Sequence, residues 1–225
     1  DLYTHRTEAL AGETGIKADD LDHIRAHALE TTDLAALWGE RLNVAADDLE
    51  ALRLAAAVHD LGKLEKSSLK AFLDSRTYER GNKRAEKKRA RFNSHEEALS
   101  ALAQSMGRSL SPRVKEILRA ANTTGAAPGD GLDPGNIRLG LILLLADVFH
   151  AAFDLRRPYK MREWAEGRLP TLEGILGHYV QLLSPYKADV REEVRAAVQE
   201  VEALARSVVS SPEFLARLQK SFVDR

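Results

Sequence analysis

The sequence predicts an all-α protein that forms a single helical bundle of about nine to eleven helices. Ala, Leu, Glu and Arg dominate the 225 residues, and no sustained alternating run of β-branched residues suggests a strand. A hydrophobic content of 44% is enough to build a core. We expect residues 1–19 to form an N-terminal lead-in and residues 20–225 to form one domain, although the length also permits two small ones.

Helices are expected where apolar residues recur at helical spacing between breaking residues. In chain order the predicted helices are 20–41, 46–60, 66–74, 79–91, 95–106, 112–122, 137–154, 161–166, 171–183, 187–208 and 212–222. The predicted breaks are Asn43, Gly62, Gly107, Pro112, the loop 123–136, Pro158, Pro170 and Pro185. The Gly- and Pro-rich loop is the longest irregular segment, and connections of this size are often functional.

Composition excludes several classes of protein. The 33 basic and 34 acidic residues balance to a formal net charge of −1, so nothing calls for nucleic acid or anionic lipid as a partner. The absence of cysteine excludes disulfides and thiolate metal sites. The apolar run 139–152 is interrupted by Asp147 and is expected to be too short to span a bilayer. No signal peptide opens the chain, which favours a cytoplasmic location, and the abrupt start favours a sensory or receiver module upstream.

Segment 55–63 is an apolar helical run that ends in the adjacent residues His59 and Asp60. Successive helical residues lie about 100° apart around the axis, so both side chains reach one ion only from the last turn. Gly62 is placed to break the helix there. Imidazole and carboxylate suit a divalent ion such as Mn, Fe, Ni or Zn. Alternatively, His59 is a core imidazole bonded to a backbone carbonyl.

Two further candidate ligands lie far from this pair in the sequence. His27 stands in the first predicted helix, and Asp147 follows a run of apolar residues. A carboxylate behind such a run is costly to bury unless a cation or hydrogen-bond donors receive it. The order His27, His59, Asp60 and Asp147 is the pattern H…HD…D. In this pattern the chain resembles the HD superfamily of metal-dependent phosphohydrolases.

The resemblance extends to HD-GYP domains, which are bacterial all-helical phosphodiesterases that often open cyclic di-GMP. Segment 146–160 is similar to a family stretch that reads roughly ADVFDAL…RPYK. Segment 211–215 resembles the family's last helix, so the similarity runs from about Asp20 to the C-terminus. The resemblance implies an HD-type helical bundle with a metal centre and a phosphorylated small molecule as substrate.

The resemblance also implies roles for the residues around the metal. Lys63 is similar to the family lysine that faces the substrate phosphate, and Asp60 would be catalytic as well as a metal ligand. Arg157 and Lys160 would clamp the phosphate. His150 replaces the acid that usually follows the last ligand by three positions. It would either line the substrate pocket or contact a metal ligand without touching the metal.

Departures from the family limit the expected metal centre. The paired histidines and the GYP loop of HD-GYP domains should fall near 119–131, where neither signature is present. The second metal site therefore retains Asp60 and His95, fewer ligands than a tightly held transition metal collects. We expect one divalent transition metal rather than two, with Mn, Fe or Ni favoured over Zn. His95 and His23 are each either a further ligand or a solvent-facing helix residue.

The function expected from the resemblance is metal-dependent hydrolysis of a phosphoester in a nucleotide or cyclic dinucleotide. Cyclic di-GMP hydrolysis itself is expected to be weak or absent, because the signature loop is replaced. The alternative is a degenerate, inactive HD-GYP-like domain that binds a nucleotide or partner protein in signalling. The apolar face from Val190 to Val209 would then serve as a homodimer surface, although core packing produces the same pattern. The basic segment 76–92 is either a solvated helix or a rim that attracts phosphorylated ligands.

Overall fold

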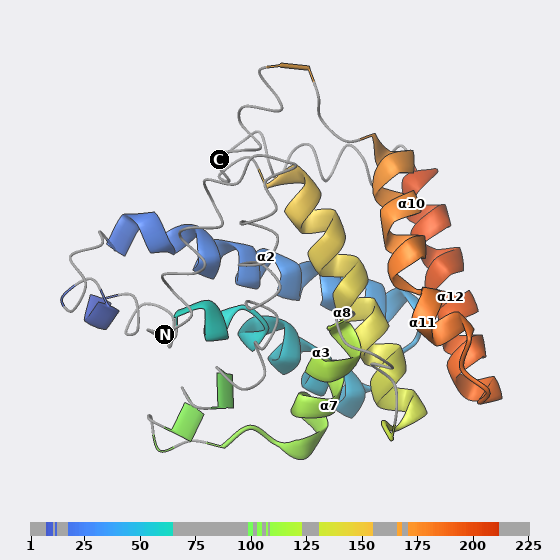
Figure 1. Cartoon of the computed structure of the whole chain (residues 1–225), viewed down its shortest axis with the longest axis horizontal. Helices are drawn as coiled ribbons and strands as arrows, with labels where there is room; N and C mark the ends of the chain where they lie inside the picture. Colours follow the sequence, from blue (N-terminus) through green and yellow to red (C-terminus); the bar gives the residue numbers. More distant parts are fainter. Residues whose placement is uncertain are drawn as a thin grey trace.

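The structure, a computed structural model of the 225-residue chain, describes residues 8–10, 12, 18–64, 99–100, 103–104, 107, 109–122, 131–154, 166–167 and 171–211. Within these ranges the chain is helical and contains no strand, which confirms the predicted all-α class (Figure 1). The main helices are α2 (Ala18–Arg41), α3 (Ala46–Val58), the 3-10 helix η1 (Leu61–Leu64), α7 (Pro112–Ala121), α8 (Pro134–Phe153), α10 (Leu172–Leu182), α11 (Ser184–Lys187) and α12 (Glu192–Val209).

Helix α8 is the central helix of the core. Nearly every residue from Asn136 to Ala146 is buried, on all sides of the helix, so other elements must surround it. By length and composition α8 could cross a membrane, but 72% of its apolar window is buried inside the protein. The sequence-based expectation considered only the apolar run 139–152, and the helix that contains it is longer, so length alone does not exclude a span. Its burial, rather than its length, identifies it as a core helix.

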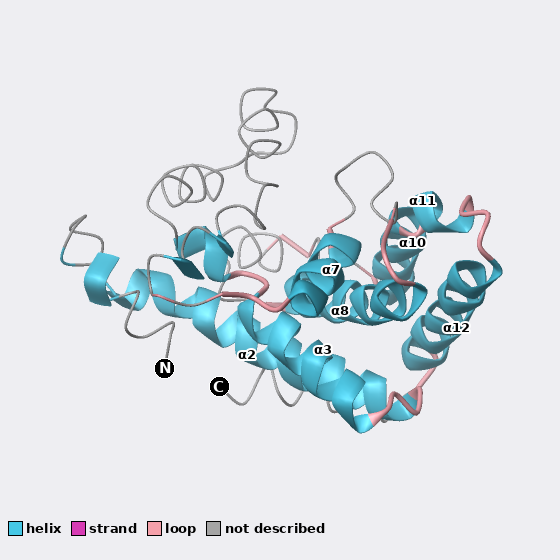
Figure 2. Ribbon diagram, turned by 90° about the horizontal axis from the view of Figure 1, so that it is seen from below, coloured by secondary structure: helices cyan, strands magenta, loops and turns pink. Residues whose placement is uncertain are grey.

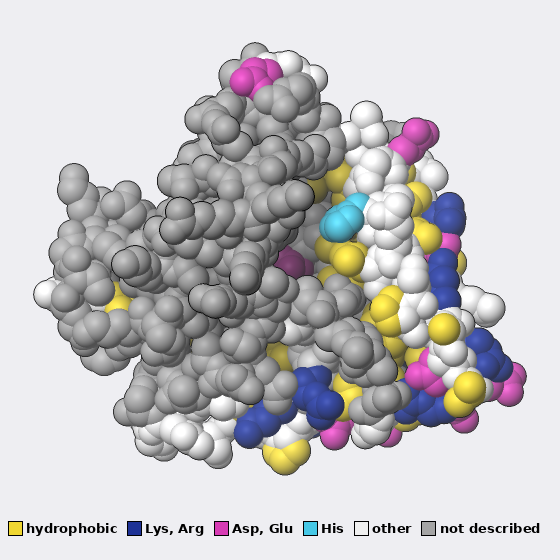
Figure 3. Space-filling model, viewed as in Figure 1, with side chains coloured by type: hydrophobic (Ala, Val, Ile, Leu, Met, Phe, Trp, Pro, Cys, Tyr) yellow, Lys and Arg dark blue, Asp and Glu magenta, His cyan; other side chains and the backbone are white. Residues whose placement is uncertain are grey.

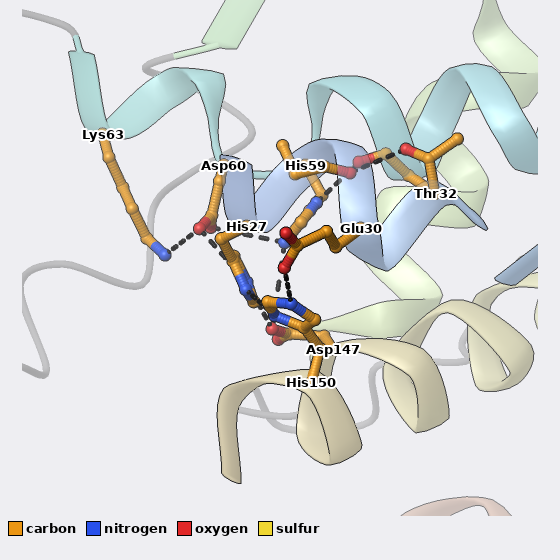
Figure 4. Close-up of polar contacts among 10 residues, drawn as sticks. His27, Glu30, Thr32, His59, Asp60, Lys63, Asp147 and His150 are labelled. Atoms are coloured by element: carbon orange, nitrogen blue, oxygen red, sulfur yellow. Dashed lines mark hydrogen bonds and ion pairs between the residues drawn. The ribbon is translucent and has the colours of Figure 1, made fainter. Parts of the chain in front are cut away.

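Helices α2 and α3 form an antiparallel pair, and α2 packs along α8 (Figure 2). The turn between them contains Asn43, whose φ of 51° lies in the left-handed region that Asn tolerates. Trp38 of α2 is fully buried, and its ring meets Phe149 of α8 edge to face at 5.7 Å. Because α3 runs back along α2, its C-terminal end returns to the level of His27 (Figure 4).

Helix α7 crosses α8 at very close range. A Cβ atom on Gly140 of α8 would lie 2.5 Å from Cβ of Ala120 and 2.8 Å from the carbonyl oxygen of Ile117. Both helices begin with a proline, and the preceding residue caps each one: Ser111 for α7 and Asp133 for α8. The missing side chain at position 140 thus lets two well-capped helices pack backbone to backbone.

Helices α10 and α12 cover another side of α8, and α11 packs against both of them (Figure 1). The buried residues of α12 are Val194, Ala197, Val198, Val201, Leu204, Ala205 and Val208. This apolar face is packed within the chain, so the homodimer surface considered for the inactive alternative is not available there. Val190 differs, with an exposed fraction of 89%. On the side formed by α10 and α12, Figure 3 shows basic and acidic side chains interspersed, as expected of a solvated surface.

Three predicted helix boundaries are wrong. The helix expected over 46–60 ends at Val58, and Gly62 does not break it but lies buried in η1. The loop expected over 123–136 ends at Asp133, which caps α8. The helix expected over 187–208 is interrupted at 188–191, and α12 begins only at Glu192.

The interruption before α12 comes from a side chain that competes with the helix. The carboxylate of Asp189 accepts hydrogen bonds from the backbone N–H and the guanidinium of Arg191. Arg191 also donates to the carbonyl oxygen of Leu132, which joins this turn to the start of α8. The expected helices 66–74, 79–91 and 212–222, most of 95–106 and of 161–166, and the basic segment 76–92 lie outside the described residues.

Candidate metal centre

His27 lies in the middle of α2, on the side that faces α8. The residue is 1% exposed. Its Nε2 atom lies 3.0 Å from Oδ1 of Asp147 and 3.6 Å from Oδ2 of Asp60. The packing of α2 on α8 and on α3 therefore brings together three residues that are far apart in the sequence (Figure 4).

His59 follows the last residue of α3 and turns its ring back over the helix. Its Nδ1 atom lies 2.7 Å from the carbonyl oxygen of Ala56. Because a carbonyl accepts but cannot donate, Nδ1 carries the hydrogen and Nε2 of the neutral ring carries the lone pair. That Nε2 atom is buried and has no hydrogen-bond partner among the described residues. It lies 3.6 Å from Oδ1 of Asp60 and 3.8 Å from Oδ1 of Asp147.

Asp60 is 5% exposed and lies between the two imidazoles. The 3-10 turn of η1 brings Lys63 back toward it, and the ammonium group of Lys63 donates a hydrogen bond to Oδ2 of Asp60. The side chain of Lys63 is 16% exposed. This ion pair holds the Asp60 carboxylate in position and adds one positive charge to the edge of the cluster.

Asp147 stands on α8 with its side chain 40% exposed, so it is the ligand candidate most open to solvent. Partial removal from water raises the pKa of its carboxyl group, but the hydrogen bond from His27 and the potential of His27 and His59 outweigh this effect. Its pKa therefore lies below the usual value. The carboxylate is held in the ionised form that a metal ligand requires.

The separations between these atoms fit a metal ion. Ligand bonds of about 2.0–2.2 Å place neighbouring ligand atoms about 3.0 Å apart at right angles and about 3.4 Å apart in a tetrahedron. The imidazole-to-carboxylate distances run from 3.0 to 3.8 Å. His27, His59 and Asp60 can also offer ligand atoms that all lie within 4.8 Å of one another. The donor set of two imidazoles and two carboxylates therefore suits a divalent transition metal.

A second group of possible ligands, formed by His27, His150 and Asp154, is buried on the other side of the His27 ring. Here the Nδ1 atoms of the two histidines lie 2.6 Å apart. This separation is shorter than that of two ligands of one ion, and it is typical of a hydrogen bond. We therefore assign the His27–His150 contact to hydrogen bonding.

His150 is completely buried, which does not fit the expected contact with substrate. Its two ring nitrogens face His27 and Glu30. Of the other predicted site residues, His95, Arg157 and Lys160 lie outside the described residues. His23 lies on α2, but its side chain also falls outside the described part.

Sequence reasoning missed Glu30 and Asp154. Glu30 follows His27 by three residues on α2, a spacing that places both on one helix face, so an acid at this position could have been noticed. Asp154 is the C-cap of α8 and is 1% exposed. No sequence pattern distinguishes it from an ordinary cap.

An all-helical fold that brings His27, His59, Asp60 and Asp147 to one cluster defines the class of protein, a helical domain with a candidate centre for a divalent metal. The HD domain family matches residues 24–152, more than half of the chain, and the chain belongs to this family. The expected membership of the HD superfamily of metal-dependent phosphohydrolases is thereby confirmed. No curated protein and no solved structure matches the chain.

Proposed function

We propose that this protein is a metal-dependent phosphohydrolase that cleaves a phosphoester in a nucleotide or cyclic dinucleotide. One divalent transition metal, Mn, Fe or Ni in preference to Zn, is held by His27, His59, Asp60 and Asp147. The observation that supports this proposal best is Nε2 of His59, a buried nitrogen without a hydrogen-bond partner among the described residues. Such an atom destabilises a fold unless something satisfies it, and a cation between the two carboxylates would do so.

The charges of the cluster favour the same proposal. Asp60 and Asp147 contribute two negative charges, and Lys63 contributes one positive charge at the edge. A divalent ion would therefore leave the site with a net positive charge. Such a site attracts the anionic phosphate of a substrate rather than repelling it.

Each side chain has a distinct part in the proposed chemistry. A bound divalent ion would supply a Lewis acid that polarises a phosphoryl oxygen and lowers the pKa of a water molecule toward neutrality. His27 and His59 present their Nε2 atoms to the ion from the buried side of the cluster. Asp147 provides the carboxylate on the solvent-exposed side, where a substrate enters. Lys63 supplies fixed positive charge for a nonbridging phosphate oxygen.

Two cations beyond the described residues complete the proposal. Arg157 and Lys160 follow Asp147 in the stretch that resembles the family's phosphate-binding segment. In this proposal they clamp the phosphate, as bidentate and point-charge donors respectively. His95 is proposed as a weak further ligand only if a second ion binds.

A second candidate function is a nucleotide-binding or protein-binding domain without catalysis. The observation that favours it is segment 119–131, which lacks the paired histidines and the GYP loop of HD-GYP domains. Turnover separates the two candidates. Hydrolysis of bis-p-nitrophenyl phosphate with added Mn, Fe or Ni is expected for the enzyme, whereas metal binding without turnover would favour the binding domain.

The test of the metal centre is the metal content of the purified protein. Elemental analysis should find about one equivalent of transition metal per chain in the wild type and little in Asp60→Asn or His59→Gln. Asp33→Asn on the exposed side of α2 and His178→Gln on the exposed side of α10 are matched controls and should keep the metal. Wild-type metal content in Asp60→Asn would show that the proposed centre is wrong.

A further inference from the structure

A row of hydrogen bonds runs from Glu30 through His150 to His27 (Figure 4). Oε2 of Glu30 lies 2.5 Å from Nε2 of His150, and Nδ1 of His150 lies 2.6 Å from Nδ1 of His27. Both rings are buried, whereas the Glu30 side chain is 19% exposed. The row therefore connects a carboxylate near the surface with the metal ligand His27, through a ring that is itself buried.

The hydrogens in this row have one arrangement if both rings are neutral. A carboxylate accepts only, so Nε2 of His150 donates to Glu30. The lone pair of His150 is then on Nδ1, which accepts the hydrogen on Nδ1 of His27. The lone pair of His27 is then on Nε2, where a bound ion would replace the hydrogen that this atom otherwise donates to Asp147. This is the tautomer that a metal ligand in this position requires.

The two ligand histidines are supported in different ways. His59 donates from Nδ1 to the carbonyl oxygen of Ala56, a neutral acceptor. His27 is connected instead to an anion, through a second imidazole that is itself polarised by that anion. Because a negative group behind a ligand imidazole raises its basicity, His27 should be the stronger donor of the two.

The row also ties together the two helices that carry ligands. Glu30 and His27 lie three residues apart on α2, and His150 follows Asp147 by three residues on α8. Each partner therefore stands one turn beyond a metal ligand on the same helix face. The hydrogen bond between the two rings holds the ligand faces of α2 and α8 toward each other.

We propose that Glu30 and His150 are positioning residues of the metal centre, an inference that rests on the metal binding proposed above. They touch neither ion nor substrate. Glu30 accepts the hydrogen on Nε2 of His150, so Nδ1 of His150 accepts the hydrogen on Nδ1 of His27. This arrangement keeps Nε2 of His27 available for the ion. His150 accordingly supports a ligand from behind and does not bind substrate.

The first test is metal affinity, measured on the full chain with Co²⁺ or Mn²⁺ alone in competition with a chromophoric chelator. Glu30→Gln keeps the size of the side chain and removes the charge, and it should raise the Kd for the metal by about 10- to 100-fold. Glu40→Gln is the matched control, because Glu40 also lies on α2 but is 55% exposed and pairs with Arg53. Its Kd should equal that of the wild type.

A rescue variant distinguishes positioning from simple packing. Oδ1 of an aspartate lies two bonds from Cβ, as does Nδ1 of a histidine, so His150→Asp places a carboxylate oxygen beside His27. Combined with Glu30→Gln, which removes the repulsion between two acids, it should bring the Kd back toward the wild-type value. In the Zn²⁺-loaded wild type, ¹⁵N NMR should also find His150 in the Nε2–H tautomer, and Glu30→Gln should yield a mixture.

The outcomes separate this inference from the proposed function. Unchanged metal affinity and an unchanged His150 tautomer in Glu30→Gln would overturn the positioning role while leaving the metal centre intact. Failure of the wild-type protein to bind any of these metals would instead overturn the proposed function.

Discussion

Replacing Gly140 with alanine should destabilise the protein by about 2 kcal/mol. The added Cβ would lie 2.5 Å from Cβ of Ala120, 2.8 Å from the carbonyl oxygen of Ile117 and 3.0 Å from the carbonyl carbon of Ala120. Carbon atoms pack at about 3.5–4.0 Å, so α7 and α8 would have to separate by about 1 Å. Two of the three neighbours are backbone atoms, which cannot rotate away. An overpacking loss of about 3 kcal/mol, less about 1 kcal/mol gained in helix propensity, leaves this net value.

The assay is urea unfolding, with Gly177→Ala of α10 as the matched control. An added Cβ at Gly177 meets no atom within 4 Å, so this substitution should stabilise the protein by about 0.5–1 kcal/mol. The same chemical change is thus expected to have opposite signs at two helical positions. If Gly140→Ala is as stable as the wild type, the close approach of α7 and α8 does not limit packing and the reasoning is refuted.

Two further predictions concern polar contacts of the C-terminal helices. Hydrogen bonding from Arg191 lowers the pKa of Asp189 from 3.8 to about 2, so this carboxylate stabilises the folded state above pH 3.8 and its contribution is lost as the pH falls toward 2. In urea unfolding over this interval the wild type should lose more stability than Asp189→Asn, and equal losses would contradict the assignment. The hydroxyl of Tyr186 donates to the carbonyl oxygen of Ala120, which lies in the last turn of α7 and has no partner within that helix. Tyr186→Phe should therefore lower the unfolding free energy by about 1–2 kcal/mol without changing metal content, and an unaltered urea midpoint would show that this bond is dispensable.

The resemblance to the HD superfamily, through the pattern H…HD…D, was sufficient to group His27, His59, Asp60 and Asp147 from the sequence. The same reasoning could not place His150. In the sequence it is a polar residue at the end of an apolar helix, and only its contacts with His27 and Glu30 show that it lies behind a ligand.

Helix ends were predicted less well than helices. Glycine at position 62 suggested a stop, yet α3 ends earlier and Gly62 is buried in a 3-10 turn. The break before α12 depends on the hydrogen bonds that Arg191 donates to the carboxylate of Asp189. Arg191 is itself oriented by a hydrogen bond to the carbonyl oxygen of Leu132, in a distant segment. A boundary that depends on such a contact is not encoded in local spacing.

By itself, the sequence determined the all-α class and the order of the metal-ligand candidates, because helical periodicity and ligand type are properties of the chain taken residue by residue. Its resemblance to a known family indicated the metal-dependent phosphohydrolases. Tertiary structure decided which faces became core. It packed α12 inward, although its apolar stripe was also compatible with a dimer surface. It also brought His150 to His27 across 123 positions, because such a contact depends on how α2 and α8 cross, and that crossing depends on the packing of the whole core.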